Sequence, residues 1–204
     1  MIFRMREIII TGKTPEEPPA VKRYTYEEYL KLDDGNRYEL IEGELVLTPS
    51  PGFKHQRTVA AIERALTTFV EEHDLGMVIV APYDVVLDEG VVLQPDILFV
   101  TREKFHLLTE ACLKGAPDLV VEVISPSSAG RDRIKKSRLY RRYGVRELWL
   151  VDPEARTAEV LTTGENGWYQ AAACDEEDIL TSPLLPGLKI NLKEIFALPE
   201  GISL

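Results

Sequence analysis

The chain has 204 residues, of which 45% are hydrophobic, so it can bury one substantial core. Its net charge of −10 argues against broad electrostatic attraction to nucleic acid. The sequence has no apolar run near the roughly 20 residues that span a bilayer, no secretory signal pattern and too few cysteines for a disulfide framework, so we expect a cytoplasmic protein.

The N-terminal part predicts a lead-in, a short helix and a hairpin. Residues 1–24 are expected to be an extended lead-in, because TGKTPEEPPAVKR contains prolines and charges but little that could pack. A single domain, residues 25–204, is expected to follow. Thr25 and Glu28 form a capping-box pattern that predicts a short helix. The segment RYELIEGELVLT then predicts a β-hairpin around Glu42-Gly43.

The middle of the chain predicts one long helix followed by strands. Apolar residues at spacings of three and four predict an amphipathic helix from about His55 to His73, ended by Gly76. Strands are expected at MVIVA, DVVL and VVLQPDILFV, and a weaker helical stretch near residues 102–113. Residues 118–124 then predict an apolar strand that is buried on both faces.

The last part predicts a strand–helix–strand crossover and a hairpin. The SPSS loop leads into a basic helix that Gly144 closes, and ELWLVD forms another buried strand. AEVLTT and WYQAAA predict a hairpin around residues 164–167, and the tail through Phe196 is expected to pack on the outside. Together these elements predict an α/β domain.

The basic charge of the chain is concentrated in residues 131–146. The segment contains eight basic residues and one acid, Asp132: Arg131, Arg133, Lys135, Lys136, Arg138, Arg141, Arg142 and Arg146. Two interpretations are open: a surface that contacts phosphates, or a solvated helix face on an acidic protein.

Two carboxylates stand out as candidates for chemistry. Glu122 interrupts the apolar run VVEVI, where a carboxylate needs a cation or a metal to offset its desolvation. Asp96 follows Pro95 and precedes the apolar run ILFV, so a strand can present it at the edge of the core. Two carboxylates on neighbouring strands suit Mg²⁺ or Mn²⁺. Alternatively, Asp96 caps a turn and Glu122 pairs with an arginine.

Lys136 is the candidate cation for this pair of acids. On a helical wheel it lies within about 60° of Leu139, Tyr140 and Tyr143, so it shares their inward stripe. An inward lysine just after a buried glutamate could position or activate a water. The alternative is a lysine that snorkels at the helix margin.

Several other polar residues have no clear role in the sequence. Glu39 alternates with apolar neighbours in a predicted hairpin, and His55 lies on the core side of its helix, where a hydrogen-bonded structural role is the more common one. Asp84, Asp118 and Tyr140 are similarly ambiguous. The sequence has no nucleotide-binding glycine loop, HExxH motif or GxSxG elbow, which excludes several common enzyme classes.

A series of sequence blocks resembles the Uma-two family of restriction-endonuclease-like proteins. The blocks span roughly residues 25–195 in the family's order: RYELIEGELV, SPGFKHQ, APYDVVL, QPDILFV, GAPDLVVEVISPSS, DRIKKSRLY and GVRELWLVDP. The resemblance implies a branch of the PD-(D/E)xK nuclease superfamily, with a mixed central sheet flanked by helices.

The resemblance also implies roles for individual residues. Asp96 matches the PD aspartate, Glu122 the second acid, and Glu39 an additional acid of the metal site. The superfamily pattern expects lysine two residues after the second acid, but this chain has Ile124 there. In the family the lysine is thought to have moved to the following helix, where Lys136 is the matching position. His55, Asp84 and Tyr140 fall on family motifs without an assigned role.

The sequence therefore predicts a metal-dependent nuclease, with Asp96, Glu122 and Lys136 as its catalytic residues. Asp96 and Glu122, with Glu39 as a further acid, would hold Mg²⁺ or Mn²⁺, and residues 131–146 would contact the phosphates of nucleic acid, expected to be DNA. The alternative is a catalytically silent module of the same fold that binds nucleic acid or a protein partner. Assembly into a homo-oligomer alone would leave the buried acids unexplained.

Overall fold

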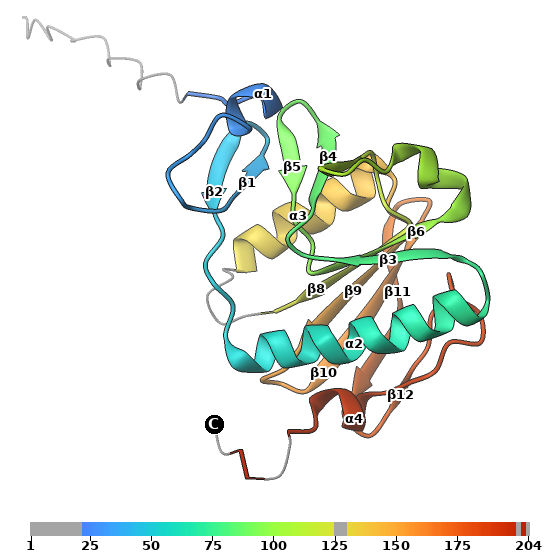
Figure 1. Cartoon of the computed structure of the whole chain (residues 1–204). Helices are drawn as coiled ribbons and strands as arrows, with labels where there is room; N and C mark the ends of the chain where they lie inside the picture. The colour runs from blue at the N-terminus through green and yellow to red at the C-terminus, as the bar shows by residue number, and fades with distance from the viewer. Residues whose placement is uncertain (1–21, 125–129, 199–200, 203–204) are drawn as a thin grey trace, which may run out of the picture.

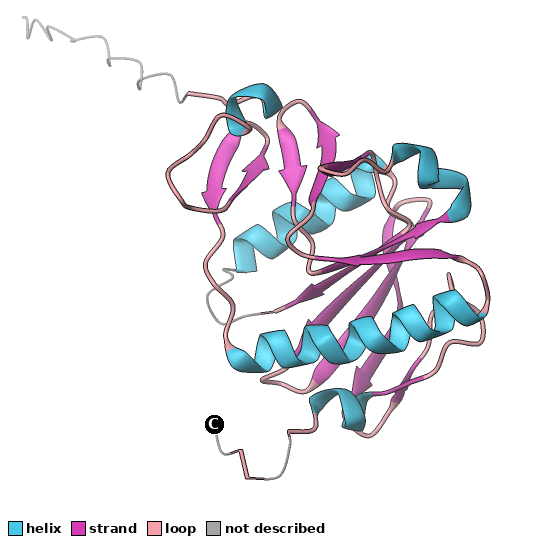
Figure 2. Cartoon of the chain, in the orientation of Figure 1, coloured by secondary structure: helices cyan, strands magenta, loops and turns pink. Residues whose placement is uncertain are grey.

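The computed structural model describes residues 22–124, 130–198 and 201–202, and only the backbone of residues 130–133. Most of the expected lead-in and the SPSS loop lie outside these ranges. Within them the chain forms an α/β fold with two main sheets and helices on their faces (Figures 1 and 2). None of the described helices is long and apolar enough to span a membrane.

The N-terminal elements agree with the sequence patterns. In α1 (Tyr26–Tyr29) the backbone N–H of Glu28 donates to the Thr25 hydroxyl, and the Glu28 carboxylate accepts from the Thr25 N–H, which confirms the capping box. The predicted hairpin is β1 (Tyr38–Ile41) and β2 (Glu44–Leu47). Its two turn residues both have positive φ, 51° at Glu42 and 84° at Gly43, a conformation that glycine adopts without strain.

The long helix α2 (Phe53–Glu72) begins slightly before the predicted start. Gly76 does not end it, contrary to expectation. The helix ends at Glu72, Asp74 turns the chain at φ 52°, and Gly76 is the first residue of β3 (Gly76–Val80). A Cβ at Gly76 would lie 2.1 Å from the carbonyl oxygen of Val100 on the paired strand, so its role is close backbone approach.

The apolar run VVLQPDILFV is two strands, where the sequence predicted one. It divides into β5 (Val91–Leu93) and β6 (Ile97–Thr101), which belong to different sheets. Pro95 lies between them and has no N–H to donate to a sheet, so pairing is interrupted there. The interruption leaves Gln94 and Asp96 at the junction of the two sheets.

The five-stranded sheet has the order β2-β1-β5-β4-β7, and the six-stranded sheet has the order β11-β10-β9-β8-β6-β3. Residues 102–113 are a 3₁₀ helix followed by a short strand, which corrects the predicted α-helical stretch. The bounds of the elements not yet given are as follows: β4 (Asp84–Asp88), η1 (Arg102–Leu107), β7 (Cys112–Lys114), β8 (Leu119–Val123), α3 (Gly130–Tyr143), β9 (Glu147–Asp152), β10 (Thr157–Gly164), β11 (Gly167–Asp175), β12 (Ile179–Leu180), β13 (Ile190–Asn191) and α4 (Leu192–Phe196).

The predicted crossover is confirmed, because β8 and β9 pair in parallel and α3 connects them. The hairpin of β10 and β11 is also present and is longer than predicted. The tail was expected to pack on the outside, but Leu188, Ile190 and Phe196 are buried in the core beside α2.

Alternation along β8 and β9 separates the two cores of the protein. Val121 and Trp149 point to the face covered by α2 and α4. Val120 and Leu148 point to the opposite face, where α3 and part of the five-stranded sheet pack. Because side chains alternate along a strand, Glu122 shares the α3 face with Val120. The strand thus directs this carboxylate toward α3 and the smaller sheet.

Candidate active site

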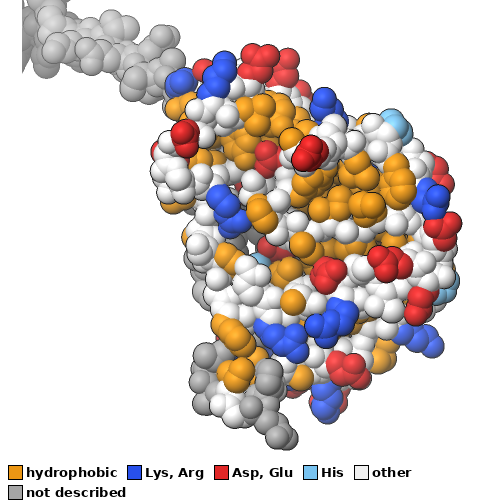
Figure 3. All heavy atoms as spheres, in the orientation of Figure 1, with side chains coloured by type: hydrophobic (Ala, Val, Ile, Leu, Met, Phe, Trp, Pro, Cys, Tyr) orange, Lys and Arg blue, Asp and Glu red, His pale blue; other side chains and the backbone are white. Residues whose placement is uncertain are grey.

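A cavity of about 350 Å³ lies where the two sheets, α3 and the first turn of α2 meet. Its wall includes all the acids and the lysine singled out in the sequence: Glu39, Asp96, Glu122 and Lys136. In the space-filling view an opening lies between the smaller sheet and α2, with acidic and histidine atoms set back inside it (Figure 3). The candidate residues are therefore gathered at one accessible hollow.

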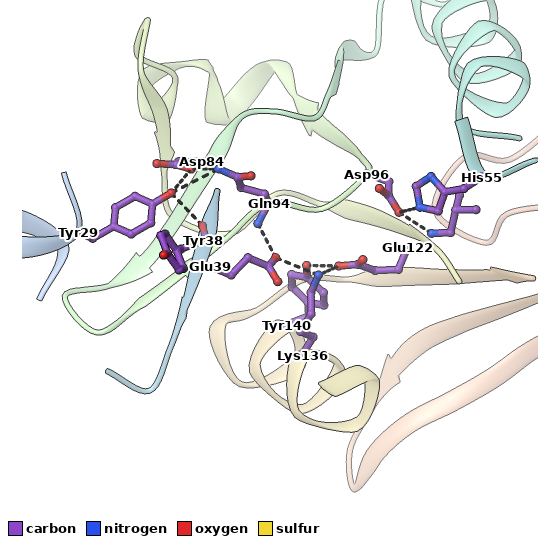
Figure 4. A network of polar contacts seen from close by, with 11 residues as sticks. Tyr29, Tyr38, Glu39, His55, Asp84, Gln94, Asp96, Glu122, Lys136 and Tyr140 are labelled. Carbon is purple, nitrogen blue, oxygen red and sulfur yellow. Dashed lines mark hydrogen bonds and ion pairs between the residues drawn. The ribbon is translucent and has the colours of Figure 1, made fainter. Parts of the chain in front are cut away.

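Lys136 lies between two carboxylates. Its ammonium is 2.7 Å from Oε1 of Glu122 and 3.0 Å from Oε1 of Glu39 (Figure 4). The lysine side chain is 14% exposed, so it does not snorkel to the surface. Lys135 instead pairs with Glu44 at 3.7 Å. The inward orientation inferred from the helical wheel is confirmed.

Tyr140 is a member of the site that sequence reasoning missed. It lies one helical turn after Lys136 and is completely buried, and its hydroxyl donates a 2.5 Å hydrogen bond to Oε1 of Glu122. The signal was available, because Tyr140 shares the inward stripe with Lys136. A buried tyrosine on an apolar stripe is ordinarily a core residue, and the sequence alone left Tyr140 ambiguous.

Asp96 lies just before β6, and Glu122 lies in the adjacent strand β8. Antiparallel pairing sets Ile97 opposite Val121, so the next positions, Asp96 and Glu122, also lie across from each other. The backbone N–H of Val123 donates to Oδ2 of Asp96 at 2.7 Å. Oδ2 is also 3.2 Å from Nε2 of His55, in the first turn of α2. His55 thus contacts one of the candidate acids.

The electrostatics of the cavity favour a proton or a cation on the acids. Burial raises the pKa of Glu122 to about 7, with further increases from the charges of Asp96 and Glu39, while Lys136 opposes the rise. Burial would lower the pKa of Lys136, but Glu122 and Glu39 outweigh that effect and raise it, so the lysine stays charged. Burial would likewise lower the pKa of His55, but Asp96 raises it above its usual range.

A second set of hydrogen bonds supports Glu39 from the smaller sheet. The backbone N–H of Gln94 donates to Oε1 of Glu39 at 2.8 Å. The Gln94 amide donates in turn to Oδ1 of Asp84 at 2.7 Å, and the Tyr29 hydroxyl donates to the same oxygen at 3.1 Å. Figure 4 shows these residues as one continuous network that reaches Lys136. Asp84 therefore supports the site indirectly, through Gln94 and Tyr29.

The cavity offers carboxylate oxygens to a divalent metal. Among the residues that the structure describes, no group of three or more His, Cys, Asp or Glu side chains could hold a metal ion. Mg²⁺, however, commonly binds through one or two carboxylates and keeps several waters. Asp96 and Glu122 fit that smaller requirement, since they are adjacent carboxylates on a cavity wall. Glu39, the third expected acid, already accepts from Lys136 and from the Gln94 N–H through Oε1.

The described part of the basic segment carries several ion pairs. Arg142 lies 3.8 Å from Glu42, and Arg146 lies 3.6 Å from Asp118. Asp118 also accepts from the Thr101 N–H and contacts Lys104 at 3.1 Å. These contacts explain Asp118, which was ambiguous in the sequence, as a structural acid at the other end of β8. The side chains of residues 131–133 lie outside the described residues.

Comparison with known proteins identifies the family. Residues 26–193 match the model of the Uma2 family, which is described as "Putative restriction endonuclease". The chain belongs to the Uma2 family. This agrees with the resemblance of the sequence blocks to the Uma-two family. No curated protein gives a match.

A solved structure supports the fold of this Uma2 chain. The structure is described as a "putative nuclease belonging to DUF820 from Anabaena variabilis ATCC 29413", and it superimposes with a TM-score of 0.71. The alignment covers 84% of this chain and 97% of that one, at 20% sequence identity. The likeness confirms the predicted fold, a mixed α/β restriction-endonuclease-like architecture.

Proposed function

We propose that this Uma2 chain is a metal-dependent nuclease that hydrolyses phosphodiester bonds of nucleic acid, with DNA as its substrate. One observation carries the proposal: the Lys136 ammonium lies 2.7 Å from Glu122, beside Asp96, on the wall of an open cavity. Two acids and a lysine are the set expected for the active site, although the lysine comes from the helix and not from the strand. Membership of the Uma2 family supports the same activity.

Asp96 and Glu122 are the residues that we propose to hold Mg²⁺ or Mn²⁺. When bound, such an ion lowers the pKa of a coordinated water and offsets charge on the attacked phosphate. The described contacts of Glu122 with Lys136 and Tyr140 both fall on Oε1. They fix the carboxylate, so we assign Oε2 to the metal. His55 and the Val123 N–H fix Asp96 through Oδ2 in the same way.

Lys136 is the cation that we propose to face the reacting phosphate. Its raised pKa keeps the ammonium protonated, so it can orient a water by hydrogen bonding and stabilise developing negative charge. We propose that Glu39, expected from the sequence as a metal ligand, is instead a positioning residue, because its Oε1 accepts from Lys136 and from the Gln94 N–H. Tyr140 likewise acts through Glu122.

The basic segment 131–146 is proposed to contact the phosphates around the site. Among the described residues, Lys135 lies 3.7 Å from Glu44 and Arg142 lies 3.8 Å from Glu42, and all four side chains are at least 42% exposed. Long ion pairs between exposed groups contribute little to stability. A phosphate can therefore displace the acids at little cost, and the charge of the segment remains available to nucleic acid.

A cleavage assay tests the proposed function. Supercoiled plasmid, single-stranded DNA and RNA are incubated with the protein in Mg²⁺, in Mn²⁺ and in EDTA. We expect DNA cleavage that requires metal and is lost in Glu122→Gln. The control is Glu177→Gln, which should remain active because Glu177 is an exposed acid in the loop between β11 and β12. DNA binding without cleavage under every condition would contradict the proposal and favour the catalytically silent module.

A further inference from the structure

The cavity lining contains a charged set of residues, the charged wall, and an apolar set, the apolar wall, and the two adjoin where Glu122 of β8 pairs with Leu150 of β9. The charged wall carries Asp96, Glu122 and Lys136. The apolar wall comes from β2, the segment that leads to α2, the end of β8 and β9, with these residues: Val46, Leu47, Pro49, Pro51, Ile124, Leu148 and Leu150. Hydrolysis of a phosphodiester requires only the charged wall. The apolar wall therefore calls for a separate explanation.

Three buried polar atoms on the cavity lining have no hydrogen-bond partner among the described residues: Oγ1 of Thr48, Oε1 of Gln94 and Nδ1 of His55. The orientation of the Gln94 amide is set by its donation to Asp84 at 2.7 Å, which leaves Oε1 as a free acceptor. Burying polar atoms without partners is costly, so such atoms in a cavity are suited to a ligand with complementary groups.

We infer that the cavity receives one unstacked nucleotide of the substrate strand. Its base lies on the apolar wall, its polar edge meets Thr48 and Gln94, and its phosphate faces Lys136. A volume of about 350 Å³ suits one such group, since pockets for small molecules span roughly 300–1,000 Å³, and it does not suit a base pair with its stacked neighbours. The inference rests on the proposed nuclease function and names its substrate: single-stranded or splayed DNA.

The energetics agree with this assignment. A base in intact duplex must be unpaired and unstacked before it can enter a pocket, whereas a base in a single strand or flap avoids most of that cost. Contacts to the face of a base are tolerant of sequence, because every base has such a face. The site should therefore discriminate between DNA structures more strongly than between sequences.

A binding measurement tests the pocket without catalysis. The probe is a single-stranded 12-mer with one 2-aminopurine, whose fluorescence increases when the base leaves its stacked neighbours, and the protein is Glu122→Gln. We expect the fluorescence to increase on binding. Adding Thr48→Val should weaken binding by about 3- to 10-fold, as expected for one lost hydrogen bond.

Leu47 and Met77 provide a matched pair for the same measurement. Both are exposed apolar side chains, at 56% and 46%, but only Leu47 lines this cavity. In the Glu122→Gln background, Leu47→Ser should reduce the fluorescence increase and Met77→Ser should not. Equal effects of the two substitutions, or binding without any fluorescence increase, would overturn the inference.

Cleavage by the wild-type protein separates this inference from the proposed function. We expect single-stranded DNA and a duplex with a single-stranded flap to be cleaved at least about tenfold faster than blunt duplex. Equal or faster cleavage of blunt duplex would overturn the unstacked-nucleotide site and leave the nuclease intact. A Leu47-dependent fluorescence increase with no cleavage of any DNA would support the pocket and contradict the nuclease.

Discussion

The two ends of β8 each carry one carboxylate in a different environment. Asp118, just before the strand, has a side chain that is 2% exposed, and it accepts from the Thr101 N–H and contacts Lys104 and Arg146. Glu122, near the other end, is 19% exposed toward the cavity and contacts Lys136 and Tyr140. Two further acids, Asp96 and Glu39, act on Glu122. Hydrogen-bond donors and cations thus surround Asp118, whereas Glu122 lies near two other acids.

The pKa values of the two carboxyl groups shift in opposite directions. Burial would raise the pKa of Asp118, but the Thr101 hydrogen bond and the Lys104 ammonium lower it below its usual range. Burial raises the pKa of Glu122, and the nearby acids add to the rise. An acid whose donors satisfy its charge stabilises the fold. An acid beside like charges instead gains stability when it binds a proton or a metal cation, because either one offsets the repulsion.

The largest effect is expected for Lys136→Met. It removes the cation shared by Glu39 and Glu122 and leaves two buried carboxylates without a countercharge, which costs roughly 3–5 kcal/mol of unfolding free energy. Metal-dependent cleavage should fall by at least about 100-fold. Urea unfolding and cleavage rates measure the two effects. Lys135→Met is the control, and a similar loss in that variant would refute the distinction between the two lysines.

The pH dependence of stability is the next largest effect. The pKa of Glu122 is raised from 4.5 to about 7 in the folded state, so this group favours folding below about 4.5 and that contribution disappears as the pH rises through about 7. The change is up to about 3 kcal/mol, at 1.36 kcal/mol per pKa unit. In EDTA, the stability of wild type relative to Glu122→Gln should decline across this window. If the difference in unfolding free energy between the two proteins did not change with pH, the raised pKa of Glu122 would be contradicted.

Asp118 should behave in the opposite way. Its lowered pKa means that its contribution to stability is present above the usual pKa of 3.8 and is lost as the pH falls through the folded-state value. Asp118→Asn should therefore cost about 1–3 kcal/mol at neutral pH, because it weakens charge-assisted contacts. Glu122→Gln should cost less, since Lys136 keeps Glu39. Chemical unfolding of both variants in EDTA at pH 7 measures the two losses of unfolding free energy. A larger loss in Glu122→Gln than in Asp118→Asn would contradict this expectation.

The smallest effect is expected for Tyr140→Phe, which removes one hydrogen bond to Glu122 and leaves the ring in the core. We expect cleavage to slow by about tenfold, which corresponds to about 1.4 kcal/mol. This is near the lower end of the range for a hydrogen bond to a charged group, because Lys136 still contacts Glu122. The dependence of the rate on Mg²⁺ concentration should shift as well, because Glu122 is less well positioned. Tyr143→Phe is the control, because the Tyr143 hydroxyl donates to the exposed Asp88 and not to Glu122.

Local patterns predicted much of this fold. The capping box at Thr25, the hairpin at Glu42-Gly43 and the crossover through α3 are all present, because each depends on residues close together in sequence. The break at Pro95 was missed, since an apolar run does not reveal that its halves join different sheets. Periodicity also could not distinguish the 3₁₀ turn after Thr101 from an α-helix.

The site was predictable to a similar degree. The helical periodicity of α3 predicted that Lys136 faces inward, and its contact with Glu122 confirms this. The contacts of Glu39 and Gln94 were not predictable, because they depend on the packing of the smaller sheet and α3 around Glu122. His55 could be placed on the core side of its helix, but its partner Asp96 lies on a distant strand.

Magnesium-dependent thermal stability tests the central claim most directly, that the cavity end of β8 binds metal and the other end does not. Melting temperatures are compared in EDTA and in saturating Mg²⁺ for wild type, Glu122→Gln and Asp118→Asn. At a metal concentration 100 times Kd, binding stabilises the native state by about 2.7 kcal/mol. We expect Mg²⁺ to raise the melting temperature of wild type and Asp118→Asn by several degrees and to leave Glu122→Gln unchanged. No increase in wild type, or an equal increase in Glu122→Gln, would contradict the account.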